Sequence, residues 1–242
     1  MENGILGKIM MNKRAFTLSE VLIALGVVGV VAVLTIPGVM RNYQNRLYTA
    51  QLEKVYAQIS DAAQAIMNDE HVDDFYESTA GGANVCKTTG EKKCTAGLAY
   101  FLQNYFKNVE TNCIKADTPC LETKVGAYKT VGGSNVAPPN TNYYYVQTIS
   151  GAVIGGSYNP GNNCTSLLID VNGVGKPNVA GRDVFAIDIR KNGTLADYRS
   201  GCLIGSPGAL ASDCTKGGTT SLFEASAGCV NSIIEAGWKM EY

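Results

Sequence analysis

The segment KRAFTLSEVLIALGVVGVVAVLTIP, Lys13–Pro37, decides the fold of this chain. No charged side chain occurs from Val21 to Met40, and an α-helix of that length spans about 30 Å, the thickness of the hydrocarbon core of a bilayer. Glu20 stands at the start of this apolar run. A carboxylate in apolar surroundings needs a counter-charge or a proton. The segment therefore predicts a membrane-spanning helix that begins with an acid in need of a partner.

Three kinds of segment compete for this pattern: a cleaved secretory signal, a simple membrane anchor, and a specialised export segment. A secretory signal ends in an A-x-A-like cleavage site, whereas the end of this run reads Leu34-Thr35-Ile36-Pro37-Gly38-Val39-Met40. An anchor accounts for the apolar run but gives Glu20 no role. A further alternative is that Glu20 lies at the level of the lipid headgroups and extends its carboxylate into water.

The sequence Lys13-Arg14-Ala15-Phe16-Thr17-Leu18-Ser19-Glu20 resembles the cleavage and methylation site of type IV prepilins and of the pilin-like proteins of type II secretion. The resemblance covers about the first 55 residues. It implies that a prepilin peptidase cuts between Ala15 and Phe16, and that Phe16 becomes an N-methylated amino terminus. It also implies that Glu20, the fifth mature residue, attracts the amino terminus of a neighbouring subunit during assembly. The freed amine of Phe16, on the same or a neighbouring chain, is then the partner that Glu20 lacks.

Two residues depart from the usual family pattern. Ala15 stands where Gly is commoner before the cut, and Ser19 stands where many members carry Ile or Val. The leader is long if translation starts at Met1, and a start at Met11 would give a compact basic leader.

The helix is expected to continue beyond the membrane. Pro37 removes one helical hydrogen bond and predicts a kink, and pilins often carry a proline there. Apolar residues then recur at steps of three and four, which predicts an amphipathic helix to about Asn68 that packs against its own domain. These residues are Tyr48, Leu52, Val55, Ile59, Ala62 and Ile66. The expected organisation is a leader at 1–15, a transmembrane and assembly helix at 16–40, its amphipathic continuation at 41–70 and a globular head at 71–242.

The head is rich in Gly, Asn, Ser, Thr and Cys, and we expect it to contain an antiparallel sheet. The pattern predicts a helix at 97–109, strands at 142–149 and 166–171, and a loop at 132–142. The Asn192-Gly193 pair predicts a hairpin between strands at 184–190 and 194–198. These patterns predict an α+β fold, and the resemblance to prepilins implies that it is type IV pilin-like, with the long helix packed against the sheet.

Eight cysteines occur between residues 86 and 229, and an even number confined to one region predicts disulfides formed in an oxidising compartment. They are Cys86, Cys94, Cys113, Cys120, Cys164, Cys202, Cys214 and Cys229. Eight cysteines allow 105 connectivities, so the pairing stays open. Three pairs are close enough in sequence for local bridges: 86 with 94, 113 with 120, and 202 with 214.

One segment of the head, residues 170–183, carries candidate ligand chemistry. It resembles a segment found in the heads of pilin-like proteins, some of which bind calcium in a carboxy-terminal loop. Asp170, Asn172, Asn178 and Asp183 supply the hard oxygen atoms that Ca²⁺ prefers, although the spacing is not that of an EF-hand. The alternative is that these side chains shape turns by bonding to their own backbone. Both readings remain open from the sequence.

Catalysis has little support in the sequence. The one histidine, His71, lies in an acidic polar stretch, and neither a G-x-S-x-G elbow nor a pair of metal-ligand histidines occurs. The formal net charge is −1, so no nucleic-acid partner is indicated. No catalytic residue is predicted, and we expect a structural protein.

The resemblance implies a minor pilin or pseudopilin of a type IV pilus or type II secretion system. Its partners would be other pilin-like subunits, the prepilin peptidase and methyltransferase, an inner-membrane assembly platform and membrane lipid. It would cross the bacterial inner membrane once, with its head in the periplasm, before entering the filament. The alternative is a membrane-anchored extracytoplasmic binding domain that holds calcium or another ligand, for which the helix is an anchor only.

Overall fold

The computed structural model describes residues 17–87, 93–159, 164–198, 214, 218 and 220–242. The chain divides into two compact units, Met1–Tyr43 and Gln44–Tyr242, and the long helix α1 (Leu18–Glu70) contributes to both. Each unit is described by itself below.

In the first unit, α1 exposes an almost unbroken apolar surface. An 18-residue window has a mean hydropathy of 2.5, and none of it is buried. Among the described residues, α1 is the one helix long and apolar enough to cross a membrane. The helix is continuous through Pro37. A kink at Pro37 therefore stays a prediction.

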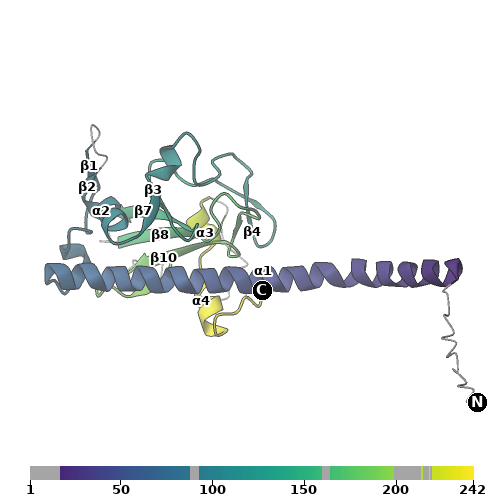
Figure 1. Ribbon diagram of the computed structural model, residues 1–242. Coiled ribbons are helices and arrows are strands. Elements are labelled where there is room, and N and C mark those ends of the chain that lie inside the picture. The colour runs from purple at the N-terminus through teal and green to yellow at the C-terminus, as the bar shows by residue number, and fades with distance from the viewer. Residues whose placement is uncertain (1–16, 88–92, 160–163, 199–213, 215–217, 219) are drawn as a thin grey trace, which may run out of the picture. The chain divides into compact units, whose positions relative to one another are not determined.

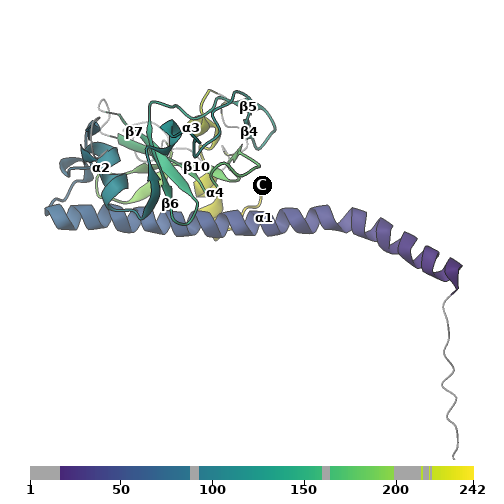
Figure 2. The ribbon, with the colours of Figure 1, turned by 45° about the horizontal axis from the view of Figure 1, so that its top comes forward.

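In the second unit, α1 buries one face against the head. All six residues of the predicted apolar face, Tyr48, Leu52, Val55, Ile59, Ala62 and Ile66, are buried, and the helix ends at Glu70. Steps of three and four residues bring side chains onto one face of a helix, so this spacing fixed the packing face. Figures 1 and 2 both show the sheet of the head beside this part of α1.

The head is built on a sheet with strand order β3-β6-β7-β8-β10-β9-β4-β5, and β11 pairs with β10. Its strands are β3 (Asn108–Thr111), β4 (Tyr128–Thr130), β5 (Asn135–Val136), β6 (Tyr144–Thr148), β7 (Val153–Asn159), β8 (Cys164–Asp170), β9 (Val179–Ala180), β10 (Val184–Ile189) and β11 (Leu195–Asp197). Most pairs are antiparallel, as predicted. The exception is β9, which runs parallel to both β10 and β4.

Both faces of the central strands are buried. On one face Ile154, Ile169 and Phe185 belong to the same apolar cluster as Leu52 and Ile59 of α1. On the other face Val153 and Leu168 pack with a second cluster. Neighbouring residues of a strand point to opposite faces, so a strand that is covered on both sides reads as a continuous apolar run. Residues 166–171 (SLLIDV), in and just after β8, and residues 184–189 (VFAIDI) of β10 follow this pattern.

The predicted helix at 97–109 is correct only in its first half. Helix α2 spans Gly97–Asn104, and residues 108–111 form the edge strand β3, which pairs with β6. Asn108 Nδ2 donates a hydrogen bond of 2.7 Å to the carbonyl of Leu102, which stabilises the chain where it leaves the helix. The spacing of apolar residues over 97–109 suits a helix, but the pairing of residues 108–111 with β6 outweighs it. The predicted loop at 132–142 likewise contains the short strand β5.

The remaining elements are short and surround the sheet. They are the 3₁₀ turns η1 (Phe75–Glu77) and η2 (Cys113–Lys115), the ribbon of β1 (Val85–Cys86) and β2 (Cys94–Ala96), and the helices α3 (Leu222–Ala225) and α4 (Cys229–Glu235). The predicted hairpin is present, since Ile187 and Ile189 of β10 lie opposite Asp197 and Leu195 of β11.

Disulfides join Cys86 to Cys94 and Cys113 to Cys120, two of the local pairs suggested by spacing. The third suggestion was wrong, because Cys214 is bonded to Cys229 and not to Cys202. Cys229 is the first residue of α4, and packing of that helix on the sheet brings it to Cys214. Cys164 is also disulfide-bonded, and Cys202 lies outside the described residues.

Candidate functional site

The described part of the candidate processing site begins at Thr17, the second residue after the predicted cut. Ala15 and Phe16, the residues predicted to flank that cut, lie outside the described residues. The structure therefore leaves the cleavage position and the methylated residue as predictions.

Glu20 is hydrogen-bonded to the first turn of its own helix. The amide N–H and the hydroxyl of Thr17 donate to Glu20 Oε2 over 2.8 and 2.9 Å. In return, Thr17 Oγ1 accepts from the Glu20 amide over 3.2 Å. This reciprocal pair is a capping box, in which two amides at the start of a helix find side-chain partners. Its sequence signal, T-x-x-E ahead of an apolar run, was available in the sequence and was missed.

The capping box places the carboxylate at the positive end of the helix dipole. Five aliphatic side chains follow directly, and Leu22 and Ile23 are largely exposed. Glu20 is exposed as well, although its carboxylate has partners. The segment therefore combines a lipid-compatible surface with one oriented acid at its start.

The segment 170–183 forms a hydrogen-bonded loop that brings Asp170 and Asp183 together at the ends of β8 and β10. Asp183 accepts bonds from the amides of Asn178 (2.8 Å) and Val179 (2.6 Å), and Asp170 accepts one from the amide of Asn172 (3.2 Å). Burial, followed by the carboxylate of Asp183, raises the pKa of Asp170 well above its ordinary value. Burial also raises the pKa of Asp183, against the effect of its amide donors. These contacts are those of a side-chain-supported turn.

The candidate calcium ligands fit a metal only in part. Both carboxylate oxygens of Asp183 already accept from backbone amides. Asp170 Oδ2, Asn172 Oδ1 and Asn178 Oδ1 are buried and accept no hydrogen bond within the described part of the chain. These three oxygens are the atoms that a cation would use, and only one of them belongs to a carboxylate. The turn is therefore the role that the geometry supports better.

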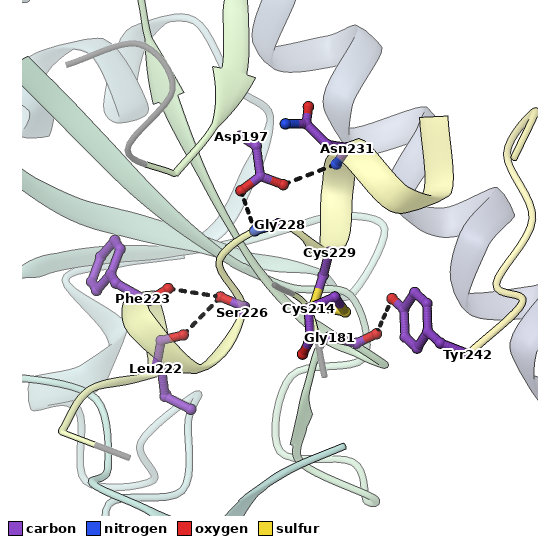
Figure 3. The surroundings of a disulfide bond; sticks show 10 residues. All are labelled: Gly181, Asp197, Cys214, Leu222, Phe223, Ser226, Gly228, Cys229, Asn231 and Tyr242. Atoms are coloured by element: carbon purple, nitrogen blue, oxygen red, sulfur yellow. Dashed lines mark hydrogen bonds between the residues drawn. A yellow bond between two sulfur atoms is a disulfide. The ribbon is translucent and has the colours of Figure 1, made fainter. Parts of the chain in front are cut away.

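A buried acid that sequence reasoning missed holds the carboxy-terminal segment. Asp197 of β11 accepts hydrogen bonds from the amides of Gly228 (2.7 Å) and Asn231 (2.9 Å), as Figure 3 shows. Gly228 is the N-cap of α4 and has no side chain to cap it, so the carboxylate of Asp197 takes that role. Burial raises the pKa of Asp197 to about 7, and the amide donors oppose the rise. No local signal marks this contact, because its partners lie more than 30 residues away.

Two further contacts hold the same segment to the sheet. The Cys214–Cys229 disulfide lies beside Gly181, and Tyr242 donates a hydrogen bond to the carbonyl of Gly181 (Figure 3). Gly181 has φ +87°, and a Cβ there would lie 2.5 Å from the sulfur of Cys229. This part of the head is thus held by contacts of β11 with the start of α4, and of Gly181, the residue after β9, with Cys229 and Tyr242.

Comparison with known proteins identifies the amino-terminal segment. Residues 10–36 match the family model for the prokaryotic N-terminal methylation motif, which is the prepilin-type cleavage and methylation segment. No curated protein and no solved structure is significantly similar to the chain. The motif suggests the precursor of a type IV pilin-like protein or pseudopilin. It implies processing by a prepilin peptidase and assembly with other pilins, and the apolar helix is consistent with membrane anchoring.

Proposed function

We propose that this chain is a minor pilin or pseudopilin, a structural subunit of a type IV pilus or of a type II secretion system. A prepilin peptidase removes residues 1–15, and the new amino terminus at Phe16 is N-methylated. The mature chain crosses the inner membrane once, with its head in the periplasm, until the assembly platform inserts it into a filament. It has no catalytic role.

One observation carries the proposal: an acid stands at the start of a lipid-compatible helix, within a segment that matches the methylation motif. The capping box would give Glu20 a role in any helix, but a carboxylate next to lipid raises the cost of insertion of an ordinary anchor. A subunit that receives the amine of a neighbour has a direct use for it, since opposite charges in an apolar medium attract strongly. The head adds support, because disulfides suit a domain that works outside the cytoplasm.

The alternative, a membrane-anchored binding domain, draws on a different observation. The three unpartnered oxygens in the 170–183 loop could take part in ligand binding. Such a protein would use α1 only as an anchor, so it would not need the cut before Phe16, and Glu20 would serve only to cap the helix. Processing of the amino terminus therefore separates the two functions.

The first test is mass spectrometry of the mature protein from its natural membrane. We expect an amino-terminal peptide that begins at Phe16 and carries one extra methyl group. An intact amino terminus upstream of Ala15 would overturn the proposal, whichever of Met1 and Met11 is the start.

The second test addresses assembly. Glu20→Ala should leave processing and membrane insertion unchanged and should remove most of the protein from sheared filaments. Ser19→Ala is the matched control, because Ser19 is the neighbouring exposed residue of the same turn. Normal incorporation of Glu20→Ala into filaments would show that Glu20 is not the assembly contact.

A further inference from the structure

A cleft of about 430 Å³ opens in the head between the β1–β2 ribbon, the turn η2 and the start of β6. Figure 1 shows the ribbon at the end of the head where α2 lies. Asn84 and Lys87 line the cleft on the side of the ribbon, Asn112 and Lys115 line it at η2, and Tyr144 lines it from β6. The volume is in the range of small-molecule sites. We call this hollow the ribbon cleft.

The wall of the ribbon cleft is held by covalent and hydrogen bonds. The Cys86–Cys94 disulfide closes the ribbon, and both of its cysteines line the cleft. The amide of Cys94 donates to Oε1 of Gln103 over 2.8 Å, and Nε2 of Gln103 donates to the hydroxyl of Tyr144 over 2.6 Å. Tyr144 is buried, so these bonds tie the ribbon to the sheet through α2. A wall that is already ordered loses little conformational entropy when a ligand binds.

The charged side chains that line the described part of the ribbon cleft are both basic. Lys87 and Lys115 are exposed, and neither forms an ion pair within the part of the chain that the structure describes. Two positive charges that border one concave surface raise the local concentration of anions. The ribbon cleft therefore favours a ligand that carries a negative charge.

The neutral side chains of the cleft suit a ligand that is rich in hydroxyl groups. Oδ1 of Asn84 already accepts from the amide of Ala99 over 2.8 Å, so the amide nitrogen of Asn84 remains to donate. The side chain of Asn112 does not cap η2, which leaves it both a donor and an acceptor for a ligand. The ring of Tyr143 also lines the cleft and offers it an apolar surface. An edge contact with Phe223, with ring centroids 6.2 Å apart, holds that ring in place.

We propose that the ribbon cleft binds an acidic saccharide, a sugar whose ring carries a carboxylate. Lys87 and Lys115 pair with the carboxylate, the asparagine side chains bond to the hydroxyls, and Tyr143 contacts the apolar face of the ring. Inorganic phosphate fits less well, because phosphate sites typically use arginine or the start of an α-helix, and neither is among the described lining residues. This binding activity goes beyond the proposed function, since it belongs to the head and needs no filament.

The experiment is isothermal titration calorimetry on the full, oxidised chain in lipid nanodiscs, with empty nanodiscs as the blank. The acidic probes are trigalacturonate, a hyaluronan tetrasaccharide and sialyllactose. The methyl ester of each probe is its neutral control, because the ester keeps the rings and hydroxyls and loses the charge. Inorganic phosphate and a tetraglutamate peptide test two other sources of negative charge.

We expect at least one acidic saccharide to bind, and its affinity to fall by about tenfold or more on esterification, because the charge-assisted hydrogen bonds are lost. Lys87→Ala and Lys115→Ala should each lower the affinity about tenfold for the same reason. Lys129→Ala is the matched control, since Lys129 is an exposed lysine of β4 that does not line the cleft. It should leave the affinity unchanged.

The variant Asn84→Asp separates ligand binding from folding. Aspartate keeps an oxygen that accepts from the amide of Ala99, but it replaces the donor of Asn84 with a negative charge that repels an anion. The melting temperature should stay near that of the wild type, while the affinity for the acidic saccharide should fall by about tenfold or more.

Three results would overturn the inference: no acidic saccharide binds, the methyl esters bind as tightly as the acids, or Lys87→Ala and Lys115→Ala bind as Lys129→Ala does. Tighter binding of phosphate or of the tetraglutamate peptide than of every saccharide would also overturn it, because the class of ligand would then be different. None of these measurements involves processing or assembly, so they leave the proposed function to its own tests.

Discussion

Gln64 Nε2 donates a hydrogen bond of 3.0 Å to the carbonyl of Asn192, which attaches the turn of the β10–β11 hairpin to α1. The next residue, Gly193, has φ +72°, and a Cβ there would lie 2.6 Å from Gln64 Nε2 and 2.7 Å from Met67 Sδ. The glycine therefore serves two purposes, since it allows the left-handed backbone of the turn and lets the helix approach.

Gly193→Ala should accordingly destabilise the head. The positive φ costs an alanine about 1–2 kcal/mol. Displacement of Gln64 from Asn192 should add about 1 kcal/mol. The measurement is the free energy of unfolding of the head in denaturant, with the transition followed by circular dichroism.

Gly133→Ala is the matched control for this substitution. Gly133 also has a positive φ, +87°, but a Cβ there would meet nothing within 4 Å. Gly133→Ala should therefore lower the unfolding free energy by only about 1–2 kcal/mol, which is what a positive φ costs an alanine. Equal losses in the two variants would show that the approach of α1 to the hairpin contributes nothing.

Removal of the Cys214–Cys229 disulfide should cost more stability than removal of Cys86–Cys94. The first closes a loop with a sequence separation of 15, and both of its cysteines are buried; the second closes a separation of 8, and Cys86 is exposed. We expect a loss of about 3 kcal/mol or more for the Cys→Ala pair at 214 and 229, against about 2 kcal/mol for the other pair. Thermal unfolding of both double variants checks the order. A larger loss at the 86–94 pair would contradict it.

The stability of the head should depend on pH through Asp197. Burial raises the pKa of Asp197 from 3.8 to about 7, so the folded state holds the proton more tightly than the unfolded chain does. The resulting stabilisation is complete below the unfolded pKa and is lost as the pH rises through the folded one. It should therefore decline between about pH 4 and pH 7, by roughly 4 kcal/mol in total.

The variant Asp197→Asn isolates this contribution. Asparagine does not titrate, so the difference in unfolding free energy between about pH 5 and pH 8, which is roughly 2–3 kcal/mol of that total, should disappear. The comparison uses the change with pH within each protein, because the substitution also alters the hydrogen bonds to Gly228 and Asn231. An unchanged pH dependence in the variant would assign the effect to other groups.

The 170–183 loop should behave as a turn and not as a calcium site. We expect millimolar CaCl₂ to leave the melting temperature of the head unchanged. Asp183→Asn should lower the unfolding free energy by about 1–3 kcal/mol, since one of two buried backbone amides loses its acceptor. A rise in melting temperature with Ca²⁺ that Asp170→Asn abolishes would instead make the loop a cation site.

Local patterns in the sequence were enough for several features. The charge-free run from Val21 to Met40 identified the apolar helix, and steps of three and four residues identified the face of α1 that packs on the head. The Asn192-Gly193 pair located the hairpin. These features depend on residues close together in the chain, where spacing alone decides which side chains share a face or form a turn.

Contacts between distant segments were not predictable in this way. Residues 108–111 read as the end of a helix until their pairing with β6 is known, and Cys214 finds Cys229 only because α4 packs on the sheet. Asp197 reads as an ordinary hairpin residue, although it caps a helix that begins over 30 residues later.

The sequence by itself determined the amino-terminal segment: its apolar length, its acid at position 20 and the motif around the predicted cut. Each of these depends on neighbouring residues and on the chemistry of lipid, so no fold is needed to read them. Only the tertiary structure decided how the head is closed, by which cysteines pair and which buried acids hold its loops. Those contacts form only when the sheet brings remote segments together, and burial then gives each carboxylate the environment that sets its charge.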